Sequence, residues 1–438
     1  MKIVLLSGGS GKRLWPLSSD ARSKQFLKIL KNEEGQYESM LQRVWRQLHG
    51  AGLSSDVHIV ASASHIEIIK QQLGDDIAVI VEPERRDTFP AIALSCLYLR
   101  DKLSVPDDEV ICVLPVDPFV EESYFRKITE FEHILNITSA DLALMGTTPT
   151  YPSAKYGYII PAVLPNTENE YMPVSAFFEK PTEQEAEKLI AVNALWNCGV
   201  FAFRLSYIRQ VIDQHNLPAS YRELQQAYNS LKKVSFDISV VEKAISIVAI
   251  TYKGYWKDLG TWNTFTEEIG ERVFGNGVLS EDSVNTHIVN ELNIPVFVLN
   301  VSNVVVAAGH EGILVTDKPT SPRLKELMKG FEQLTMYEER QWGSYRVLDY
   351  FDKDGRRTIT KRINIFMNSL WRNETRVDEI HTITIVDGPC IFASQGRRLE
   401  CMRGEVISVV PGQFYSLYST QQEIEIIHVQ IETANRIQ

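Results

Sequence analysis

The chain has 438 residues, of which 44% are hydrophobic and 23% charged, so it is globular in composition and long enough for two or three domains. Its formal net charge of −11 disfavours a nucleic-acid partner, and no apolar run reaches the ~20 residues that a membrane span needs. The five cysteines form no C-x-x-C pair, which argues against a disulfide framework or zinc site and favours a reducing, cytoplasmic compartment.

The first half of the chain alternates short apolar runs with helical patterns. Runs rich in Val and Ile cover residues 2–6, 56–62, 77–82, 109–117 and 141–147, and helical patterns cover 39–50 and 90–103. Apolar strands separated by helices predict a mostly parallel sheet that is covered on both faces. Ligands of such sheets bind beyond the carboxyl ends of the strands.

The alternation of apolar strands and helices ends at about Ile159, and antiparallel segments are expected after it. A helix around Trp262 and Arg272 is expected to close this part of the chain. Residues 285–318 indicate a run of short strands with Asn and Gly turns, and a charged helical linker is expected over 321–334.

The loop after the first strand, "SGGSGKRLWPLSSDARSKQF" (7–26), is the main candidate for phosphate binding. It is not a Walker A loop, because Leu6 stands where the first glycine belongs. It is not a dinucleotide fingerprint either, because Leu14 replaces the third glycine. Its glycines allow backbone N–H groups to approach an anion, and Arg13 and Lys24 can bracket a triphosphate.

This stretch resembles the G-G-x-G-[TS]-R-L-x-P-L signature of sugar-1-phosphate nucleotidylyltransferases. Its "RLWPLS" and "KQF" are similar to those of mannose-1-phosphate guanylyltransferases. The resemblance implies that Arg13 and Lys24 are catalytic, while Lys12 departs from the small hydroxyl residue that is usual there. The nucleotide-binding residues of the loop would be Ser7, Gly8, Gly9, Gly11 and Lys12.

The segment "EPERRDTFPAIAL" is similar to the part of that family that lies against the nucleotide base. Glu82, Arg86 and Thr88 are therefore expected at the nucleotide. Asp87 stands in place of the usual Asn and can accept hydrogen bonds from the N1–H and amino group of guanine. The alternative is that Asp87 only caps the helix that begins near Pro90.

Two aspartates resemble the metal ligands of the family. "VLPVDPFV" places Asp117 at the end of a strand, and "YWKDLGTW" supplies Asp258. Together they are expected to hold Mg²⁺, which takes one or two protein oxygens plus substrate phosphates and neutralises charge during the displacement. For either aspartate alone, a capping role is the alternative.

Three further matches, "YGYI", "FFEKP" and "WNCGVFAF", imply contacts to the sugar. The sugar-binding residues would be Gly157, Tyr158, Glu179 and Asn197. Lys180 is expected to be catalytic and to orient the sugar 1-phosphate for in-line attack, so that catalysis needs positioning and electrostatics but no protein nucleophile. Glu242 in "SFDISVVEK" is either close to the hexose or a surface charge.

The tail, 339–438, alternates with period two, as expected of a small β-barrel or sandwich. "RQWGSYRVLD" resembles the opening of the type II phosphomannose isomerase cupin. The positions of that domain's metal ligands hold Trp371, Asn373, Glu374, Thr375 and Tyr415 here. An alternative ligand set, Glu374, Asp378 and His381, lacks the expected imidazoles. The tail is therefore expected to have no isomerase activity and to serve packing or dimer contacts.

The resemblance implies an α/β protein in three parts. These are a nucleotidyltransferase domain with a Rossmann-like mixed, mostly parallel sheet (1–275), a β-rich segment with a helical linker (276–335) and a degenerate cupin-like β domain (336–438). The implied reaction converts GTP and mannose 1-phosphate into GDP-mannose and pyrophosphate with Mg²⁺. Neither a nucleic acid nor a membrane is expected as a partner. A homodimer is the assembly considered for this chain.

Two alternatives stay open. The first is the same chemistry on another hexose or base, which Asp87, Phe89 and Cys198 favour because they depart from the family pattern. The second is a catalytically silent paralogue that senses nucleotide sugars and regulates a partner. Retention of the five catalytic candidates argues against this second reading.

Overall fold

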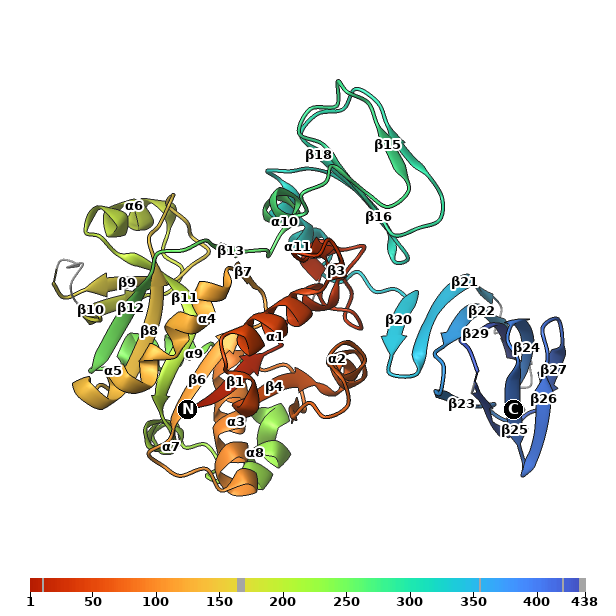
Figure 1. Cartoon of the computed structure of the whole chain (residues 1–438), viewed down its shortest axis with the longest axis horizontal. Helices are drawn as coiled ribbons and strands as arrows, with labels where there is room; N and C mark the ends of the chain where they lie inside the picture. Colours follow the sequence, from red (N-terminus) through yellow and green to blue (C-terminus); the bar gives the residue numbers. More distant parts are fainter. Residues whose placement is uncertain (10–11, 164–169, 354–355, 420, 433–438) are drawn as a thin grey trace. The chain divides into compact units, whose positions relative to one another are not determined.

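The protein was analysed as a computed structural model that describes residues 1–9, 12–163, 170–353, 356–419 and 421–432 (Figure 1). The chain divides into two compact units. The first unit comprises Met1–Ser10, Gln25–Ile66 and Leu73–Gly260, and the second comprises Gly11–Lys24, Glu67–Gln72 and Thr261–Gln438. Of the helices that the structure describes, none combines the length and apolarity needed to cross a membrane.

A mixed nine-stranded sheet of order β5-β4-β1-β6-β11-β8-β12-β10-β9 forms the first unit. Its strands are β1 (Lys2–Leu6), β4 (Val57–Ser62), β5 (Val79–Glu82), β6 (Val110–Pro115), β8 (Leu142–Thr147), β9 (Tyr158–Pro161), β10 (Met172–Phe178), β11 (Leu195–Arg204) and β12 (Ile247–Tyr252). Strands β5, β4, β1 and β6 are parallel, as are β8 and β12, whereas β11 runs antiparallel between β6 and β8. The predicted strands of the first half and the antiparallel segments after Ile159 are thus confirmed.

Two short antiparallel pairs accompany the sheet. They are β2 (Leu30–Lys31) with β3 (Tyr37–Glu38), and β7 (Pro118–Val120) with β13 (Trp256–Asp258). The helices of the first unit are α1 (Met40–Gly50), α3 (Thr88–Leu103), α4 (Glu122–Ile128), α5 (Glu130–Thr138), α6 (Glu183–Ala191), α7 (Leu205–Gln214), α8 (Tyr221–Ala227) and α9 (Phe236–Ser239). Helix α2 (Ile66–Leu73) lies almost entirely in the second unit.

Helix α3 is buried on nearly all sides, which explains why its sequence is apolar rather than amphipathic. One hydrophobic cluster joins it to one face of the sheet and to α7 and α8. Helix α1 begins at Ser39, whose hydroxyl accepts the N–H of Gln42 in a capping box. The two helices predicted in the first half are therefore both present, with α3 starting two residues earlier than expected.

The second unit contains a helix and then a coil of short strands (Figure 1). Its elements up to residue 327 are α10 (Trp262–Glu268), β14 (Val273–Phe274), β15 (Gly277–Leu279), β16 (His287–Asn290), β17 (Val296–Val298), β18 (Val304–Gly309), β19 (Gly312–Asp317) and α11 (Leu324–Leu327). Strands β14, β16 and β18 pair in parallel, as do β15 and β17. Gly275 has φ +79°, and a Cβ there would lie 1.8 Å from the Asn290 carbonyl oxygen, so the coil requires glycine at this turn.

The charged linker is less helical than predicted. Helix α11 ends at Leu327, and the following residues up to 334 form turns and irregular chain. The segment contains Gly330 at φ +80°, a conformation that interrupts a helix.

The C-terminal part consists of two antiparallel sheets, as predicted. They are a six-stranded sheet of order β20-β21-β22-β29-β24-β27 and a four-stranded sheet of order β23-β28-β25-β26. The strands are β20 (Tyr337–Arg340), β21 (Gly343–Lys353), β22 (Arg356–Ile365), β23 (Leu370–Glu374), β24 (Glu379–Asp387), β25 (Cys390–Ser394), β26 (Arg397–Cys401), β27 (Val406–Val409), β28 (Phe414–Tyr418) and β29 (Ile424–Glu432). Apolar side chains from both sheets form one shared core.

Candidate active site

Residues 7–9 follow directly on β1 at the carboxyl edge of the parallel strands. The Ser7 N–H donates to the Val60 carbonyl at 2.9 Å, and the Gln25 amide donates to the Ser7 carbonyl at 3.1 Å, so the start of the loop is fixed. Gly8 and Gly9 are exposed, with open space where a Cβ would lie, and Gly9 has φ +138°. No neighbouring side chain therefore fills the Cβ positions of these two glycines, while Gly11 lies outside the described residues.

The cations of the loop belong to the second unit. Lys12 pairs with Asp20 at 3.3 Å, Arg13 is exposed, and Lys24 is half-buried. Arg22, which the sequence analysis did not single out, is buried between Glu291 and Glu339 and lies 5.1 Å from the ring centre of Tyr337. Its role is thus structural, and it holds the end of the loop to the β-rich part of the second unit.

The base segment after β5 is tied to the chain around residues 228–236. The buried Glu82 accepts the Tyr228 hydroxyl at 2.9 Å and the Arg86 N–H at 3.1 Å, and burial raises the pKa of Glu82. The Arg86 guanidinium donates to the carbonyl oxygens of Leu231, at 3.2 Å, and Asn229. The side chains of Glu82 and Arg86, which were both predicted at the nucleotide, therefore hold this loop in its conformation.

Asp87 and Thr88 form the N-terminus of α3. The Asp87 carboxylate accepts the Thr88 N–H at 2.8 Å, and the Thr88 hydroxyl accepts the Phe236 N–H at 2.8 Å. Asp87 is exposed and has φ +70° and ψ −176°, a sparsely populated conformation for a residue with a side chain. The capping contact predicted for Asp87 is present, and its carboxylate still faces solvent.

Asp117 and Asp258 come from segments far apart in sequence that lie side by side. Strand β7 begins immediately after Asp117, and in its antiparallel pairing with β13 Pro118 faces Asp258. The neighbouring Gly260 leaves room for one carboxylate, because a Cβ there would lie 3.0 Å from the Asp258 Oδ2 atom. Two adjacent carboxylates at the carboxyl edge of the sheet are oxygen ligands of the kind that a divalent cation prefers.

No group of three or more His, Cys, Asp or Glu side chains that could enclose a metal occurs within the ranges that the structure describes. Asp117 and Asp258 offer oxygen ligands of the kind that a hard divalent cation takes alongside substrate phosphates and water.

The predicted sugar residues gather around β9, β10 and β11. Gly157 packs so closely on Phe177 and Glu179 that a Cβ would lie 2.6 Å from the Phe177 Cζ atom and 2.7 Å from the Glu179 Oε2 atom. The Gly157 carbonyl accepts the Asn197 N–H at 2.8 Å. Glycine is needed here to bring Glu179 and Asn197 close to each other.

Three carboxylates, Glu179, Asp237 and Glu242, form what we call the acid cluster. Asn197 donates its amide to the Asp237 Oδ1 atom at 3.0 Å, and the Glu179 N–H donates to Glu242 at 3.1 Å. Lys180 forms an ion pair with Glu179 and is mostly exposed. Burial and the nearby Glu179 raise the pKa of Asp237 to about 7.

Asp237 is the residue that the sequence analysis missed. Its signal was present in "SFDISVVEK", where attention went to Glu242 alone. Tyr158, in contrast, is fully buried, and its hydroxyl bonds with Ser153 and the Trp196 indole. The side chain of Tyr158 therefore serves the core around the site.

The positions aligned with the isomerase metal ligands have other structural roles. Trp371 is buried in the core of the C-terminal sheets, and the Thr375 hydroxyl donates to the Val410 carbonyl at 2.8 Å. His381 bonds through Nδ1 to the Tyr415 hydroxyl at 2.8 Å, away from the exposed Glu374.

These features define the class of the protein. The nucleotidyl transferase family model matches residues 2–271, well over half of the chain, and the chain belongs to this family. It is therefore an enzyme that transfers nucleotidyl groups. The nine-stranded sheet, Asp117 and Asp258 all lie within the matched residues.

Particular relatives lie at moderate distance. The chain is 27% identical over 392 residues to the mannose-1-phosphate guanylyltransferase of Escherichia coli K12, covering 82% of this chain and 80% of that protein. It is 28% identical over 400 residues to the alginate biosynthesis protein AlgA of Pseudomonas syringae pv. tomato, covering 83% and 79%. The crystal structure of a protein named mannose-1-phosphate geranyltransferase, from Thermus thermophilus, matches with a TM-score of 0.63 at 27% identity, over 75% of this chain and 98% of that one.

Proposed function

We propose that the protein is a mannose-1-phosphate guanylyltransferase, which forms GDP-mannose and pyrophosphate from GTP and mannose 1-phosphate. The observation that carries the proposal is the register of β7 and β13, which brings Asp117 and Asp258 together at the carboxyl edge of a nucleotidyl transferase sheet. The names of the relatives in Escherichia coli and Thermus thermophilus support mannose 1-phosphate as the sugar substrate.

In the proposed reaction an oxygen of the sugar phosphate attacks the α-phosphorus of GTP in line. The new P–O bond forms as the bond between the α-phosphorus and the bridging oxygen breaks, and the electron pair leaves with pyrophosphate. Asp117 and Asp258 would hold Mg²⁺, which supplies positive charge to the phosphates. Arg13 and Lys24 are proposed to stabilise the triphosphate, and Lys180 to orient the sugar phosphate.

We assign nucleotide binding to the loop at residues 7–9 together with Gly11 and Lys12, and to the base segment from Glu82 to Thr88. The sugar is proposed to contact Gly157, Tyr158, Glu179 and Asn197, with Asp237 added to that set. The acid cluster suits a sugar because carboxylate oxygens accept hydrogen bonds from several hydroxyls at once.

We keep the predicted division into residues 1–275, 276–335 and 336–438 as a proposal, with the last part making packing or dimer contacts. A cytoplasmic location is proposed as well, supported by five cysteines that are all unpaired and buried. We expect no mannose 6-phosphate isomerisation, and robust turnover in that assay with added divalent metal would contradict this.

The test is a panel of nucleoside triphosphates against hexose 1-phosphates, scored by pyrophosphate release. We expect GTP with mannose 1-phosphate and Mg²⁺ to give the highest kcat/KM. A different preferred pair would favour the alternative substrates, for which the exposed carboxylate of Asp87 is the structural argument.

The silent paralogue is tested by Lys24→Ala. An enzyme should lose turnover by a factor on the order of 10³, because a charged group that stabilises the transition state is removed. A regulator would bind nucleotide sugar without turnover in the parent chain, and the variant would then change nothing in the activity assay.

A further inference from the structure

The loop segment over residues 12–24 carries the cations that are proposed for catalysis, and it belongs to the second unit. Arg13 stands near the beginning of this segment and Lys24 at its end. The stretch between them is held at several points by residues of the same unit that follow Thr261. The positions of both cations therefore depend on these contacts.

The first anchor of the segment is at Trp15. The indole N–H of Trp262, on α10, donates to the Trp15 carbonyl at 3.0 Å. The Trp15 ring lies so close to Gly312 that a Cβ there would be 2.6 Å from the Trp15 Cζ2 atom. A Cβ at Gly309 would likewise lie 2.9 Å from the Pro16 carbonyl oxygen. The hairpin of β18 and β19 thus accepts this part of the loop because two glycines leave room for it.

The second anchor is the buried Arg22. Its guanidinium pairs with Glu291 and lies 3.7 Å from the Oε1 atom of Glu339, and it is 5.1 Å from the ring centre of Tyr337. Ser19 closes the turn before it, since the Arg22 N–H donates to the Ser19 hydroxyl at 3.2 Å and the Ser19 N–H donates to the Arg22 carbonyl at 2.9 Å. Displacing such a buried cation would leave charges without partners, so Arg22 is firmly held.

The two carboxylates that hold Arg22 come from different parts of the unit. Glu291 follows the buried Asn290, whose amide donates to the carbonyl oxygens of Asn276 and Ile294 at 2.7 Å each, inside the coil of short strands. Glu339 lies on β20, which pairs with β21 of the C-terminal sheets. One arginine of the loop is therefore bound both by the coil and by the C-terminal domain.

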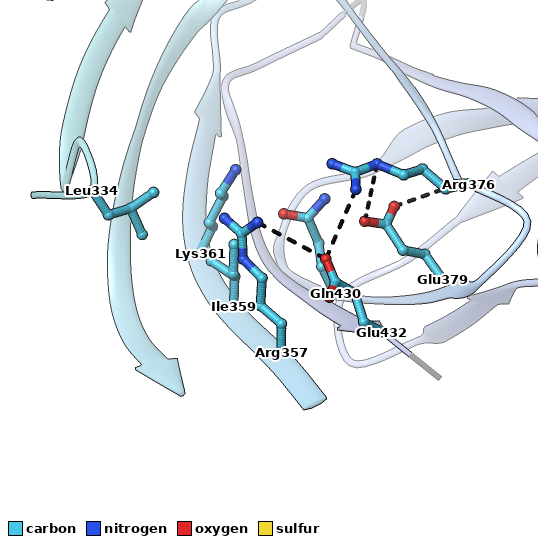
Figure 2. Close-up of a pocket in the computed structure, with 8 residues that line it drawn as sticks. All are labelled: Leu334, Arg357, Ile359, Lys361, Arg376, Glu379, Gln430 and Glu432. Atoms are coloured by element: carbon cyan, nitrogen blue, oxygen red, sulfur yellow. Dashed lines mark hydrogen bonds and ion pairs between the residues drawn. The ribbon is translucent and has the colours of Figure 1, made fainter. Parts of the chain in front are cut away.

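Other arginines of the C-terminal domain pair within that domain. Figure 2 shows Arg357 and Arg376 beside the carboxylates that they contact, around a cavity of about 220 Å³. Arg357 lies 3.9 Å from Glu432 and 5.6 Å from the ring centre of Tyr350, so its surroundings are of the same kind as those of Arg22. Both of these partners of Arg357 belong to its own sheet, which makes this arginine a matched reference.

Arg22 is two residues away from Lys24, and the residue on the other side of Lys24 is fixed as well. The amide of the buried Gln25 donates to the carbonyl and the hydroxyl of Ser7, at 3.1 and 3.3 Å, within the first unit. Two residues of chain span at most about 7 Å, so a shift of Arg22 would be passed on to the backbone of Lys24. The place of Lys24 is thus set from both sides.

We propose that Arg22 is a positioning residue for nucleotidyl transfer, through which Glu291 and Glu339 set the place of Lys24. This inference rests on the proposed function, because the role of Lys24 at the triphosphate is itself proposed. Arg22 acts through the backbone and needs no contact with a substrate. The C-terminal domain thereby takes part in the transferase reaction, in addition to packing.

The test measures kcat and KM for pyrophosphate release by the full chain. Arg22→Met should lower kcat/KM for GTP by a factor on the order of 10², because a displacement of about 1 Å at a catalytic group has an effect of that size. Glu339→Gln keeps the shape of the side chain and should lower it roughly tenfold, since one charged partner is lost. The KM for mannose 1-phosphate should stay within twofold in both variants.

Two further variants separate positioning from stability. Arg22→Lys keeps the charge without the planar fork, and it should recover part of the activity that Arg22→Met loses. Arg357→Met, in the matched pair of Figure 2, should leave every kinetic constant within twofold. Arg22→Met and Glu339→Gln with a lower unfolding temperature but unchanged kcat and KM would show a purely structural role and overturn the inference.

Hydrogen–deuterium exchange gives a readout that does not depend on activity. Peptides that cover residues 12–24 should exchange several-fold faster in Arg22→Met and Glu339→Gln than in the parent chain and in Arg357→Met. Unchanged exchange over this segment in both loop variants would overturn the positioning role by itself. A parent chain that releases no pyrophosphate from any substrate pair would instead overturn the proposed function, whatever the exchange shows.

Discussion

Both units of the protein bury ionisable side chains, but the first unit buries acidic groups and the C-terminal domain buries histidines. In the first unit the acid cluster gathers carboxylates beside one lysine, and Asp237 favours its protonated form. In the C-terminal domain His381, Tyr415 and His428 form a chain of contacts, and burial lowers the pKa of both histidines. Burying these groups costs free energy in both places, and internal hydrogen bonds offset part of that cost.

The comparison also separates what each cluster can bind. Carboxylates that are close together and partly open accept hydrogen bonds, as a sugar with several hydroxyls requires. The buried imidazoles of His381 and His428 are instead held in the neutral form, and their ring nitrogens bond with the Tyr415 hydroxyl. The difference is one of charge state, with acidic groups in the first unit and neutral bases in the C-terminal domain.

The largest expected effect tests whether the chemistry belongs to the first unit alone. Asp258→Asn should lower kcat/KM for pyrophosphate release by a factor on the order of 10³, because one of two adjacent carboxylates for the metal is lost. Glu374→Gln, an exposed change on β23, is the control and should stay within twofold. Similar losses in both variants would break the comparison.

A second prediction concerns the close approach at Gly157. Gly157→Ala should raise the KM for mannose 1-phosphate roughly tenfold or more, since the new methyl group would displace Glu179 and Phe177. The KM for GTP should change much less. Ser175→Ala, at an exposed position of β10, is the matched control, and an unchanged sugar KM in Gly157→Ala would remove Glu179 from the sugar site.

The histidines predict acid sensitivity of the C-terminal domain. Their pKa values are lower in the folded than in the unfolded state, so the stabilisation is complete above the ordinary value of about 6.5 and is lost as the pH falls below it. The loss should be about 1.4 kcal/mol per pH unit for each histidine that takes up a proton on unfolding. It can be measured by denaturant unfolding, followed by near-ultraviolet circular dichroism, of the parent chain and of His428→Phe. A variant that is as acid-sensitive as the parent would exclude His428 as the cause.

Asp237 predicts the opposite trend. Its pKa is raised above the unfolded value, so the stability that it contributes is present at low pH and is lost as the pH rises from about 4 to 7. Asp237→Asn, which keeps an oxygen for the Asn197 amide, should be more stable than the parent at pH 8, by about 1.4 kcal/mol for each unit by which the pKa is raised, and equally stable at pH 4. The same shift at both pH values would contradict a titrating Asp237.

Much of this fold could be predicted from local pattern. The strands that end at Leu6 and Pro115 and the helix that begins near Thr88 follow from apolar periodicity and from capping signals, which act over a few residues. The prediction for the linker over 321–334 was wrong in part, because its charged pattern suggested a longer helix than the chain forms before Gly330.

The site was only partly predictable, for a physical reason. Asp117 and Asp258 were predicted as a pair only through the family resemblance. The backbone pairing that brings their segments together joins strands about 140 residues apart, which no local pattern encodes. Asp237 was not singled out because its raised pKa arises from burial and from Glu179, which is 58 residues away along the chain. The nucleotide-binding role of Arg86 stays a prediction, and the two carbonyls that its guanidinium contacts are brought near only by the folded chain.

The strained backbone at Asp87 limits how this protein can evolve. With φ +70° and ψ −176° the position lies in a region of backbone conformation that strongly favours glycine, so any side chain there is strained. Exchange of Asp87 for Asn would remove a charge with little change in the shape of the side chain. On the role at the base that is proposed for Asp87, selectivity between purines would then depend on this one position, whereas bulkier replacements would first have to rebuild the turn.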